Sequence, residues 1–222
     1  MISDVIGKVA IAVLFTIFAE ATLAIDTPAD IREVKMAPLV RGGMVFQEYC
    51  VVCHGQKGDG KSAATRLYKD LDLAIKPGTA EYYEKMVAKG SAALGKSPFM
   101  PPYGEEIEEE DLADLMVYLA VIRDPIKRGE VVFKVNCILC HGVKADGQGR
   151  TSQLYEPRPS DLRRSDKNRD YMLQIVKHGG EAMGRSPVMP QWGLQISEAE
   201  IEDVVDYVQH LVAETAAANP KK

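Results

Sequence analysis

The sequence lacks the features of several common classes of protein. It has no surplus of positive charge, since its 27 basic residues are outnumbered by 32 acidic ones, for a net charge of -5. The basic residues are also scattered, which argues against a nucleic-acid-binding protein. There is no succession of long apolar runs, and 27% of the residues are charged, which excludes a membrane protein with several spans. Cysteine and histidine are scarce, with four of each. All the cysteines and two of the histidines fall in two short windows.

The first 24 residues predict an export signal. A short polar start precedes an apolar run over residues 9–19, and small residues then allow cleavage after Ala21 or Ala24. The run is too short for a comfortable transmembrane helix, and an uncleaved membrane anchor is the alternative. Either way the rest of the chain is exported, and we expect a periplasmic location. Residues 25–38 are expected to form an extended lead-in, and residues 214–222 a flexible tail.

The rest of the sequence contains an internal repeat. A shift of 87 residues places 41–68 on 128–155 with nearly half of the positions identical, and a shift of 89 places 82–118 on 171–207. The second copy therefore has a two-residue insertion between these blocks. A period of this length corresponds to one small domain rather than to a solenoid unit. We therefore expect two tandem domains, over residues 39–124 and 125–213.

Each copy is predicted to be all-α. Apolar residues recur at helical spacing in the last part of each copy, and no stretch alternates as a strand would. Thr79 predicts the start of one helix, and Ser165 or Asp166 predicts the start of its equivalent in the second copy. Ser197 with Glu200 predicts a capping box before the last helix. A small helical unit with many loops has a thin core and needs something to pack around.

Each copy also contains the sequence Cys-x-x-Cys-His, which is typical of covalent haem c attachment. On a helical turn, thiols three residues apart can form thioethers with the two vinyl groups of one porphyrin. The histidine that follows supplies a nitrogen ligand to the iron. The sequence thus predicts two covalent haem c groups, held by Cys50, Cys53 and His54 and by Cys137, Cys140 and His141.

Three other interpretations of the paired cysteines are weaker. A thioredoxin-type redox pair would lie in a βαβ pattern, which the sequence does not show. One zinc site shared by both pairs fits poorly with their wide separation and with a histidine after each. A disulfide within each pair is compatible with an exported protein. Two motifs in register within a repeat favour haem attachment over all three.

The repeats resemble class I cytochrome c domains, and their tandem arrangement resembles dihaem cytochromes of the c4 type. The resemblance covers residues 39–213 and includes a Ser-Pro-x-Met-Pro segment in each copy. It implies that Met100 and Met189 are the sixth iron ligands, and a thioether ligand raises the reduction potential relative to a second histidine. It also implies that Tyr103 and Trp192 donate hydrogen bonds to haem propionates; simple packing against the haem is an equal alternative.

The same resemblance implies how each domain is assembled. The first and last helices of a domain should cross, at Gly42 and Tyr118 and at Gly129 and Tyr207. A proline carbonyl usually orients the haem-binding histidine in such domains. The second copy has Pro157 and Pro159 for this role, but the first has Asp70 opposite Pro157. Another carbonyl would have to act there.

Together these features predict an exported dihaem cytochrome that transfers single electrons and is not itself an enzyme. Expected partners are donor and acceptor proteins, such as a quinol-oxidising complex, a dehydrogenase or a terminal oxidase, and no nucleic acid. One alternative is a haem-bearing subunit of a larger membrane oxidoreductase. Another is a dihaem enzyme with one labile axial ligand, against which the matched Met100 and Met189 argue. A non-haem disulfide or metal scaffold is the weakest.

Overall fold

The structure is a computed structural model that describes residues 37–68, 71–73 and 79–219. The expected export signal and nearly all of the lead-in lie outside the described residues. The chain divides into two units, Met1–Lys35 and Met36–Lys222, and the fold described below belongs to the second. Within the described ranges, no helix is both long enough and apolar enough to cross a membrane.

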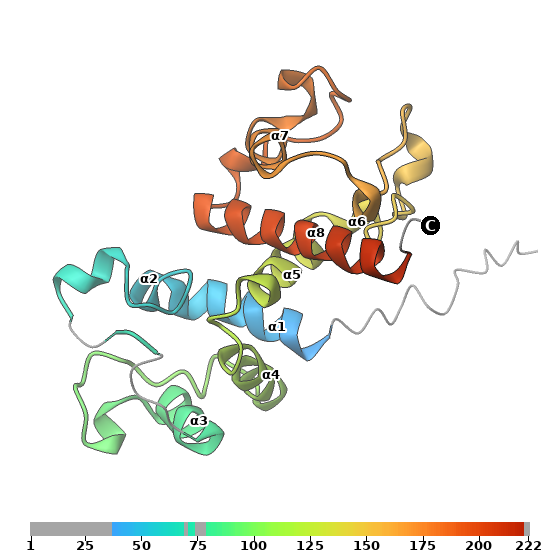
Figure 1. Ribbon diagram of the computed structural model, residues 1–222. Coiled ribbons are helices and arrows are strands. Elements are labelled where there is room, and N and C mark those ends of the chain that lie inside the picture. Colours follow the sequence, from blue (N-terminus) through green and yellow to red (C-terminus); the bar gives the residue numbers. More distant parts are fainter. Residues whose placement is uncertain (1–36, 69–70, 74–78, 220–222) are drawn as a thin grey trace, which may run out of the picture. The chain divides into compact units, whose positions relative to one another are not determined.

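The described part of the chain is helical (Figure 1) and contains no strand. An isolated bridge joins Asp59 and Asp72. The prediction of an all-α fold is confirmed. The elements of the first copy are α1 (Pro38–Val45), a π-helical turn η2 (Phe46–Cys50), α2 (Val51–His54), η3 (Ala63–Arg66), α3 (Ala80–Lys89), η4 (Ala92–Leu94) and α4 (Glu109–Leu119). Those of the second are α5 (Pro125–Asn136), α6 (Ile138–His141), η5 (Ser152–Leu154), η6 (Leu162–Arg164), α7 (Arg169–Ala182), η7 (Trp192–Leu194) and α8 (Glu198–Ala218).

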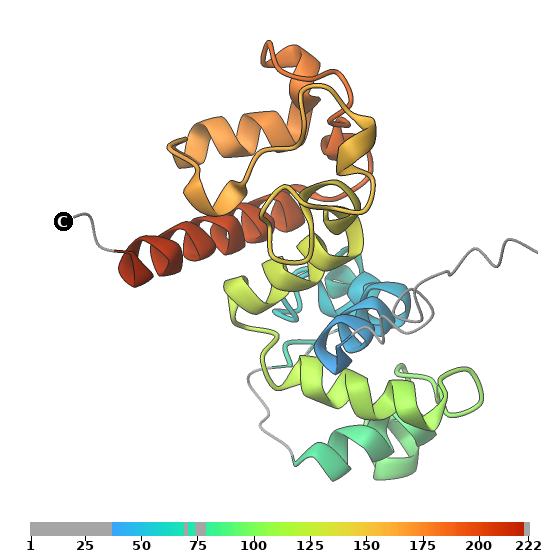
Figure 2. The same ribbon diagram turned by 90° about the vertical axis from the view of Figure 1, so that its right-hand side faces the viewer.

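In each copy the first and last long helices cross at a glycine. Helix α1 packs on α4, and α5 packs on α8, as Figures 1 and 2 both show. A Cβ atom on Gly42 would lie 2.0 Å from the carbonyl oxygen of Asp114, and one on Gly129 would lie 2.0 Å from that of Asp203. Only glycine allows two helix backbones to approach this closely. The crossing implied by the sequence resemblance is therefore present in both copies.

Aromatic rings lie beside each crossing. The rings of Phe46 and Tyr118 have centroids 5.5 Å apart, and those of Phe133 and Tyr207 are 5.6 Å apart. Phe46 and Phe133 are almost completely buried. Each pair belongs to the buried apolar cluster of its domain, where aromatic rings contribute large buried surfaces.

An arginine and an aspartate at equivalent repeat positions also join the crossing helices. Arg41 donates from Nε to Asp114 at 2.5 Å, and Arg128 donates from Nε and Nη2 to Asp203 at 2.7 Å each. Arg41 also contacts Glu110 at 3.1 Å near the surface. Both side chains of the Arg128–Asp203 pair are buried. Loss of either partner would leave an unpaired buried charge, which strongly destabilises a protein.

Two of the predicted helix starts are confirmed and one is wrong. The Thr79 hydroxyl accepts from Tyr82 N at the start of α3, and Ser197 with Glu200 forms the expected capping box of α8. Helix α7 instead begins after Asn168, whose side chain accepts from Tyr171 N at 2.9 Å. Neither Ser165 nor Asp166 is therefore its cap. The polar loop before α7 contains several residues that could cap a helix, and the cap is the last of them, Asn168.

The last helix is longer than the sequence predicted. Helix α8 continues to Ala218, so residues 214–218 are helical where a flexible tail was expected. Three of these five residues, 216–218, are alanine, the strongest helix former. Thr215 also bonds through its hydroxyl to the carbonyl of Leu211 at 2.8 Å. The alanines favour this helical extension, and the flexibility of the tail stays a prediction.

Candidate haem sites

Each Cys-x-x-Cys-His segment includes a single helical turn, α2 or α6, that ends at a glycine. Gly55 follows His54 with φ 74°, and Gly142 follows His141 with φ 79°. A Cβ atom would lie 2.7 Å from Lys61 O at the first position and 2.6 Å from the side chain of an aspartate at the second. Both the left-handed backbone and the lack of space require glycine. The chain therefore turns sharply just after each histidine.

Both histidine rings are oriented by a backbone carbonyl. His54 Nδ1 lies 2.7 Å from Leu71 O, and His141 Nδ1 lies 3.4 Å from Ser160 O. A carbonyl only accepts, so Nδ1 carries the proton and Nε2 keeps its lone pair for a metal. Burial lowers the pKa of both rings, while the carbonyl contact acts in the opposite direction. A neutral imidazole is the form that binds iron.

The expectation of a proline carbonyl in this role is wrong for the second copy. The acceptor is Ser160, the residue after Pro159. The Pro159 carbonyl instead faces Gly147, where a Cβ atom would lie 2.4 Å from its oxygen. Ser160 and Leu71 are equivalent under the shift of 89 residues. The two-residue insertion of the second copy therefore lies before the acceptor residue. Neither Pro157 nor Pro159 is equivalent to Leu71.

None of the four cysteines forms a disulfide in the structure. Burial raises the pKa of Cys50 and of Cys137, the first cysteine of each motif, to about 12. By exposure, Cys50 is buried, whereas Cys53, Cys137 and Cys140 are partly exposed. Among the described residues, no group of three or more histidine, cysteine, aspartate and glutamate side chains gathers as a zinc site would require.

The second copy encloses a cavity of about 870 Å³ next to its motif. Cys137, Cys140 and His141 line this cavity together with Met189 and Trp192. All five predicted site residues of this copy are thus brought together. Apolar side chains complete the wall, contributed by α5, α7 and α8, namely Phe133, Met172, Ile175, Val176, Val204, Val205 and Val208. The volume, the apolar wall and the two thiols, imidazole and thioether fit a covalently held porphyrin.

In the first copy, three of the equivalent residues lie together. Met100 and Tyr103 pack against the buried cluster that contains Cys50. The ring of Tyr103 lies edge-on to that of Tyr49, with centroids 5.7 Å apart. Burial raises the pKa of the Tyr103 phenol, with Cys50 close enough to add to the effect. Contacts of Tyr103 and Trp192 with haem propionates stay a prediction.

The methionine loops are held in the same way in both copies. Ser91 N donates to Met100 O at 3.1 Å, and Gly180 N donates to Met189 O at 3.1 Å. In the first copy the Ser91 hydroxyl also accepts from Met100 N at 3.3 Å. These bonds fix each loop against the residue after a glycine, which is Gly90 at the end of α3 and Gly179 at a non-helical break inside α7. The methionine position therefore depends on backbone geometry that is shared by the repeat.

Several residues that shape the sites were not identified from the sequence. Gly90 (φ 75°) and Gly179 (φ 81°) are two of them, since a Cβ atom on either would lie 2.9–3.0 Å from the backbone of the methionine loop. Leu71 and Ser160 act through their carbonyls and carry no side-chain signal. The repeat alignment could have paired these positions, since each pair is related by 89 residues.

Comparison with known proteins identifies the family. The model of the family "Cytochrome C oxidase, cbb3-type, subunit III" matches the chain twice, over residues 37–119 and 124–208. The chain belongs to this family. The cbb3-type cytochrome c oxidase subunit FixP of Azorhizobium caulinodans is 24% identical over 180 residues, covering 77% of this chain and 58% of the relative. Subunit CcoP of Azospirillum brasilense is 24% identical over 213 residues, covering 85% and 68%.

The relatives are longer than the part that matches. The chain spans 58% of the length of the FixP relative and 68% of the CcoP relative. Among solved structures, a chain of the Kuenenia stuttgartiensis reducing HAO-like protein complex is 19% identical, with 78% and 96% coverage and a TM-score of 0.35. That likeness is too low to support an argument.

Membership of the cbb3-type subunit III family confirms the tandem c-type cytochrome domains predicted from the sequence. The family is the cbb3 type, where the sequence resemblance was to the c4 type. With both cytochrome domains and both attachment motifs present, the protein carries two covalently bound haem c groups. It is an electron-transfer cytochrome.

Proposed function

We propose that this protein carries single electrons to a cbb3-type terminal oxidase, as a haem-bearing subunit of that complex. The observation that supports this most is the duplicated donor set. In the second copy, two thiols, a carbonyl-oriented imidazole and a methionine thioether line one cavity, and the first copy repeats each of these residues. A pair of matched sites in one chain suits a relay between a donor and an acceptor.

The residues around each site act to hold and enclose. The two cysteines would anchor the porphyrin through thioethers, and the histidine and the methionine would bind its iron. We assign the histidines as His54 and His141 and the methionines as Met100 and Met189. When bound, each haem supplies one-electron chemistry through its iron. In the second copy, apolar side chains of α7 and α8 line the cavity, and a thioether ligand would raise the potential relative to a second histidine.

The proposed setting is the periplasm, with export directed by the N-terminal segment. Whether the segment is cleaved or kept as an anchor, the haem domains face the same compartment. The expected electron donor is a quinol-oxidising complex or a dehydrogenase. The acceptor is the oxidase to which the relatives FixP and CcoP belong by name.

Carbon monoxide tests whether both sites are closed. The reduced holoprotein is mixed with the gas, and its optical spectrum is compared before and after. We expect no binding at either haem, together with methionine–iron charge-transfer absorption in the oxidised protein. Ready binding at one haem would overturn the carrier function for that domain and favour an enzyme with a labile ligand.

A second experiment tests the partner. The reduced holoprotein is added to membranes that contain a cbb3-type oxidase lacking its own subunit III, and oxygen uptake is followed. Oxidation of the protein at the expense of oxygen supports the proposal. Continued reduction of the protein, beside a control in which native subunit III restores uptake, would contradict it.

A further inference from the structure

The two haem domains meet through a contact that depends on a glycine of α1. A Cβ atom on Gly43 would lie 2.6 Å from Cγ1 and 2.9 Å from Cγ2 of Val131, a residue of α5. Val131 is 5% exposed and belongs to the buried apolar cluster of the first domain, with Tyr118 and Leu115. A side chain of the second domain therefore completes the core of the first.

The repeat indicates that Gly43 serves this contact more than its own domain, where a Cβ atom would first meet Cε2 of Tyr118, at 3.3 Å. The equivalent residue of the second copy is Glu130, whose carboxylate accepts from Lys127 at 3.1 Å and from Lys134 at 2.6 Å. A cytochrome domain of this chain thus accommodates a long side chain at that helix position. In the first copy the position is glycine, and Val131 of the other domain occupies the space that a side chain would fill.

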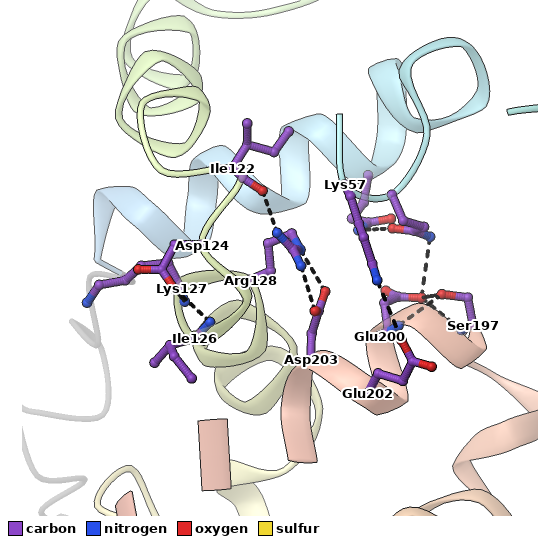
Figure 3. Close-up of polar contacts among 12 residues, drawn as sticks. Lys57, Ile122, Asp124, Ile126, Lys127, Arg128, Ser197, Glu200, Glu202 and Asp203 are labelled. Atoms are coloured by element: carbon purple, nitrogen blue, oxygen red, sulfur yellow. Dashed lines mark hydrogen bonds and ion pairs between the residues drawn. The ribbon is translucent and has the colours of Figure 1, made fainter. Parts of the chain in front are cut away.

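Arg128 forms a second link between the domains. Its Nη1 donates to the carbonyl of Ile122 at 2.7 Å, while Nε and Nη2 bind Asp203 (Figure 3). Ile122 lies beyond α4, at the end of the first domain. The equivalent Arg41 directs its additional donor to Glu110 at the surface instead. The arginine that fixes the helix crossing of the second domain thus also holds the end of the first.

A polar chain forms a third link, and it starts beside a haem ligand. Gln56, two residues after His54, accepts from Gln47 at 2.7 Å and donates to Glu200 at 3.4 Å. Glu200 also accepts from Ser197 in the capping box that begins α8 (Figure 3). Helix α8 forms part of the wall of the second haem cavity. The loop after one proximal histidine is thereby bonded to a helix that encloses the other site.

We propose that Gly43, Arg128 and Gln56 are positioning residues that hold the two haem domains as one fixed pair. The fixed pairing sets the rate at which an electron passes between the two sites within the chain. This inference rests on the proposed electron-transfer function. It concerns the contact between the domains and none of the haem ligands.

The test is a size exchange at the contact in the holoprotein. Gly43→Ala should displace α5 from α1, and Gly43→Ala combined with Val131→Ala should restore the approach by removing the opposing methyl groups. Val131→Ala alone is the matched control, because it keeps the glycine. Small-angle X-ray scattering measures the radius of gyration of each variant. Exchange of haem methyl resonances in the half-reduced protein measures electron transfer, and its concentration-independent part is the intramolecular rate.

We expect Gly43→Ala to increase the radius of gyration and slow the intramolecular exchange, and the double variant to recover both. Equal intramolecular rates in the single variant and the unchanged protein, despite a changed radius, would overturn the positioning role. An unchanged radius would overturn the contact itself. Absence of redox-active haems in the unchanged protein would instead be a failure of the proposed function.

Gln56→Ala with Lys57→Ala gives an independent variant, because both side chains are partly exposed and neither belongs to a core cluster. Lys57 pairs with Glu202 at 3.5 Å, next to the Gln56–Glu200 bond. We expect a slower intramolecular exchange with an unchanged optical spectrum for each haem. An unchanged exchange rate would refute the contribution of the polar chain, even if Gly43→Ala failed to fold.

Discussion

Replacement of Gly129 by alanine should destabilise the second domain strongly, although alanine is the better helix former. The added Cβ atom would lie 2.0 Å from the carbonyl oxygen of Asp203 on α8 and 2.8 Å from Cβ of Tyr207. Restoring an ordinary contact requires α5 and α8 to separate by more than about 1 Å. Because the opposing atom belongs to a helix backbone, no rotamer change can relieve it.

The size of the effect follows from two opposing contributions. Overpacking of a core costs about 1–3 kcal/mol, and more where backbone must move. Separation of the helices also stretches the 2.7 Å bonds between Arg128 and Asp203 beyond hydrogen-bonding range. The helix propensity of alanine returns about 1 kcal/mol. We expect a net loss of at least about 2 kcal/mol, a large part of the roughly 5–15 kcal/mol of a typical domain.

Chemical denaturation of the holoprotein, followed by far-ultraviolet circular dichroism and haem absorbance, measures this loss. Gly42→Ala is the matched variant, since its Cβ atom would lie 2.0 Å from Asp114 O. It should lower the stability of the first domain in the same way. A stability that is unchanged or raised by about 1 kcal/mol would show that helix propensity alone acts at these positions. The close crossing of the helices would then be refuted.

Three further predictions follow from the described contacts. Arg128→Met should lower the free energy of unfolding by about 3–5 kcal/mol, because it leaves a buried carboxylate unpaired. Arg41→Met should lower it less, because the Arg41 side chain is 21% exposed against 6% for Arg128. Urea unfolding measures both losses, and equal losses would contradict the role of burial. Met189→Ala should allow carbon monoxide to bind the second haem in the reduced protein. Met183→Ala should not, because Met183 does not line the cavity. Identical spectra of the two variants with carbon monoxide would refute Met189 as the ligand. Burial raises the pKa of Tyr207 to about 12. Between about pH 10 and 12, the phenol therefore keeps its proton in the folded protein and loses it in the unfolded protein. The free energy of unfolding should fall as pH rises through this window. Tyr207→Phe should reduce that fall in thermal melts followed by circular dichroism, and an unaltered slope would exclude Tyr207 as its source.

The sequence was most informative where a short segment carries its own chemistry. The attachment motifs, the Thr79 cap and the Ser197–Glu200 capping box are local patterns, and the structure contains each of them. The helix crossing at Gly42 was implied by a resemblance between whole domains. These features depend on residues close together in the sequence or on a repeated position.

Features that depend on backbone atoms were less accessible. The carbonyl of Ser160 orients His141 because of the path of the loop, and any residue type could supply that oxygen. The choice of Asn168 as the cap of α7, over the candidates before it, likewise depends on where the loop meets the helix. Both features depend on tertiary packing, and the side-chain types in the sequence do not reveal them.

The contact between the domains left a sign in the sequence that was not used. Gly43 stands opposite Glu130 in the repeat alignment, within a block where nearly half of the positions are identical. A glycine inside a helix costs about 1 kcal/mol relative to alanine. Its presence in one copy alone indicates a contact which that copy makes and the other does not, and the structure identifies the partner as Val131.

Spectroelectrochemical titration of the purified protein tests the central claim most directly. The account predicts that the protein takes up two electrons per chain, one in each domain, and that its colour survives acid-acetone extraction because both haems are covalently attached through Cys50, Cys53, Cys137 and Cys140. Uptake of a single electron, or loss of the colour to the solvent, would contradict it.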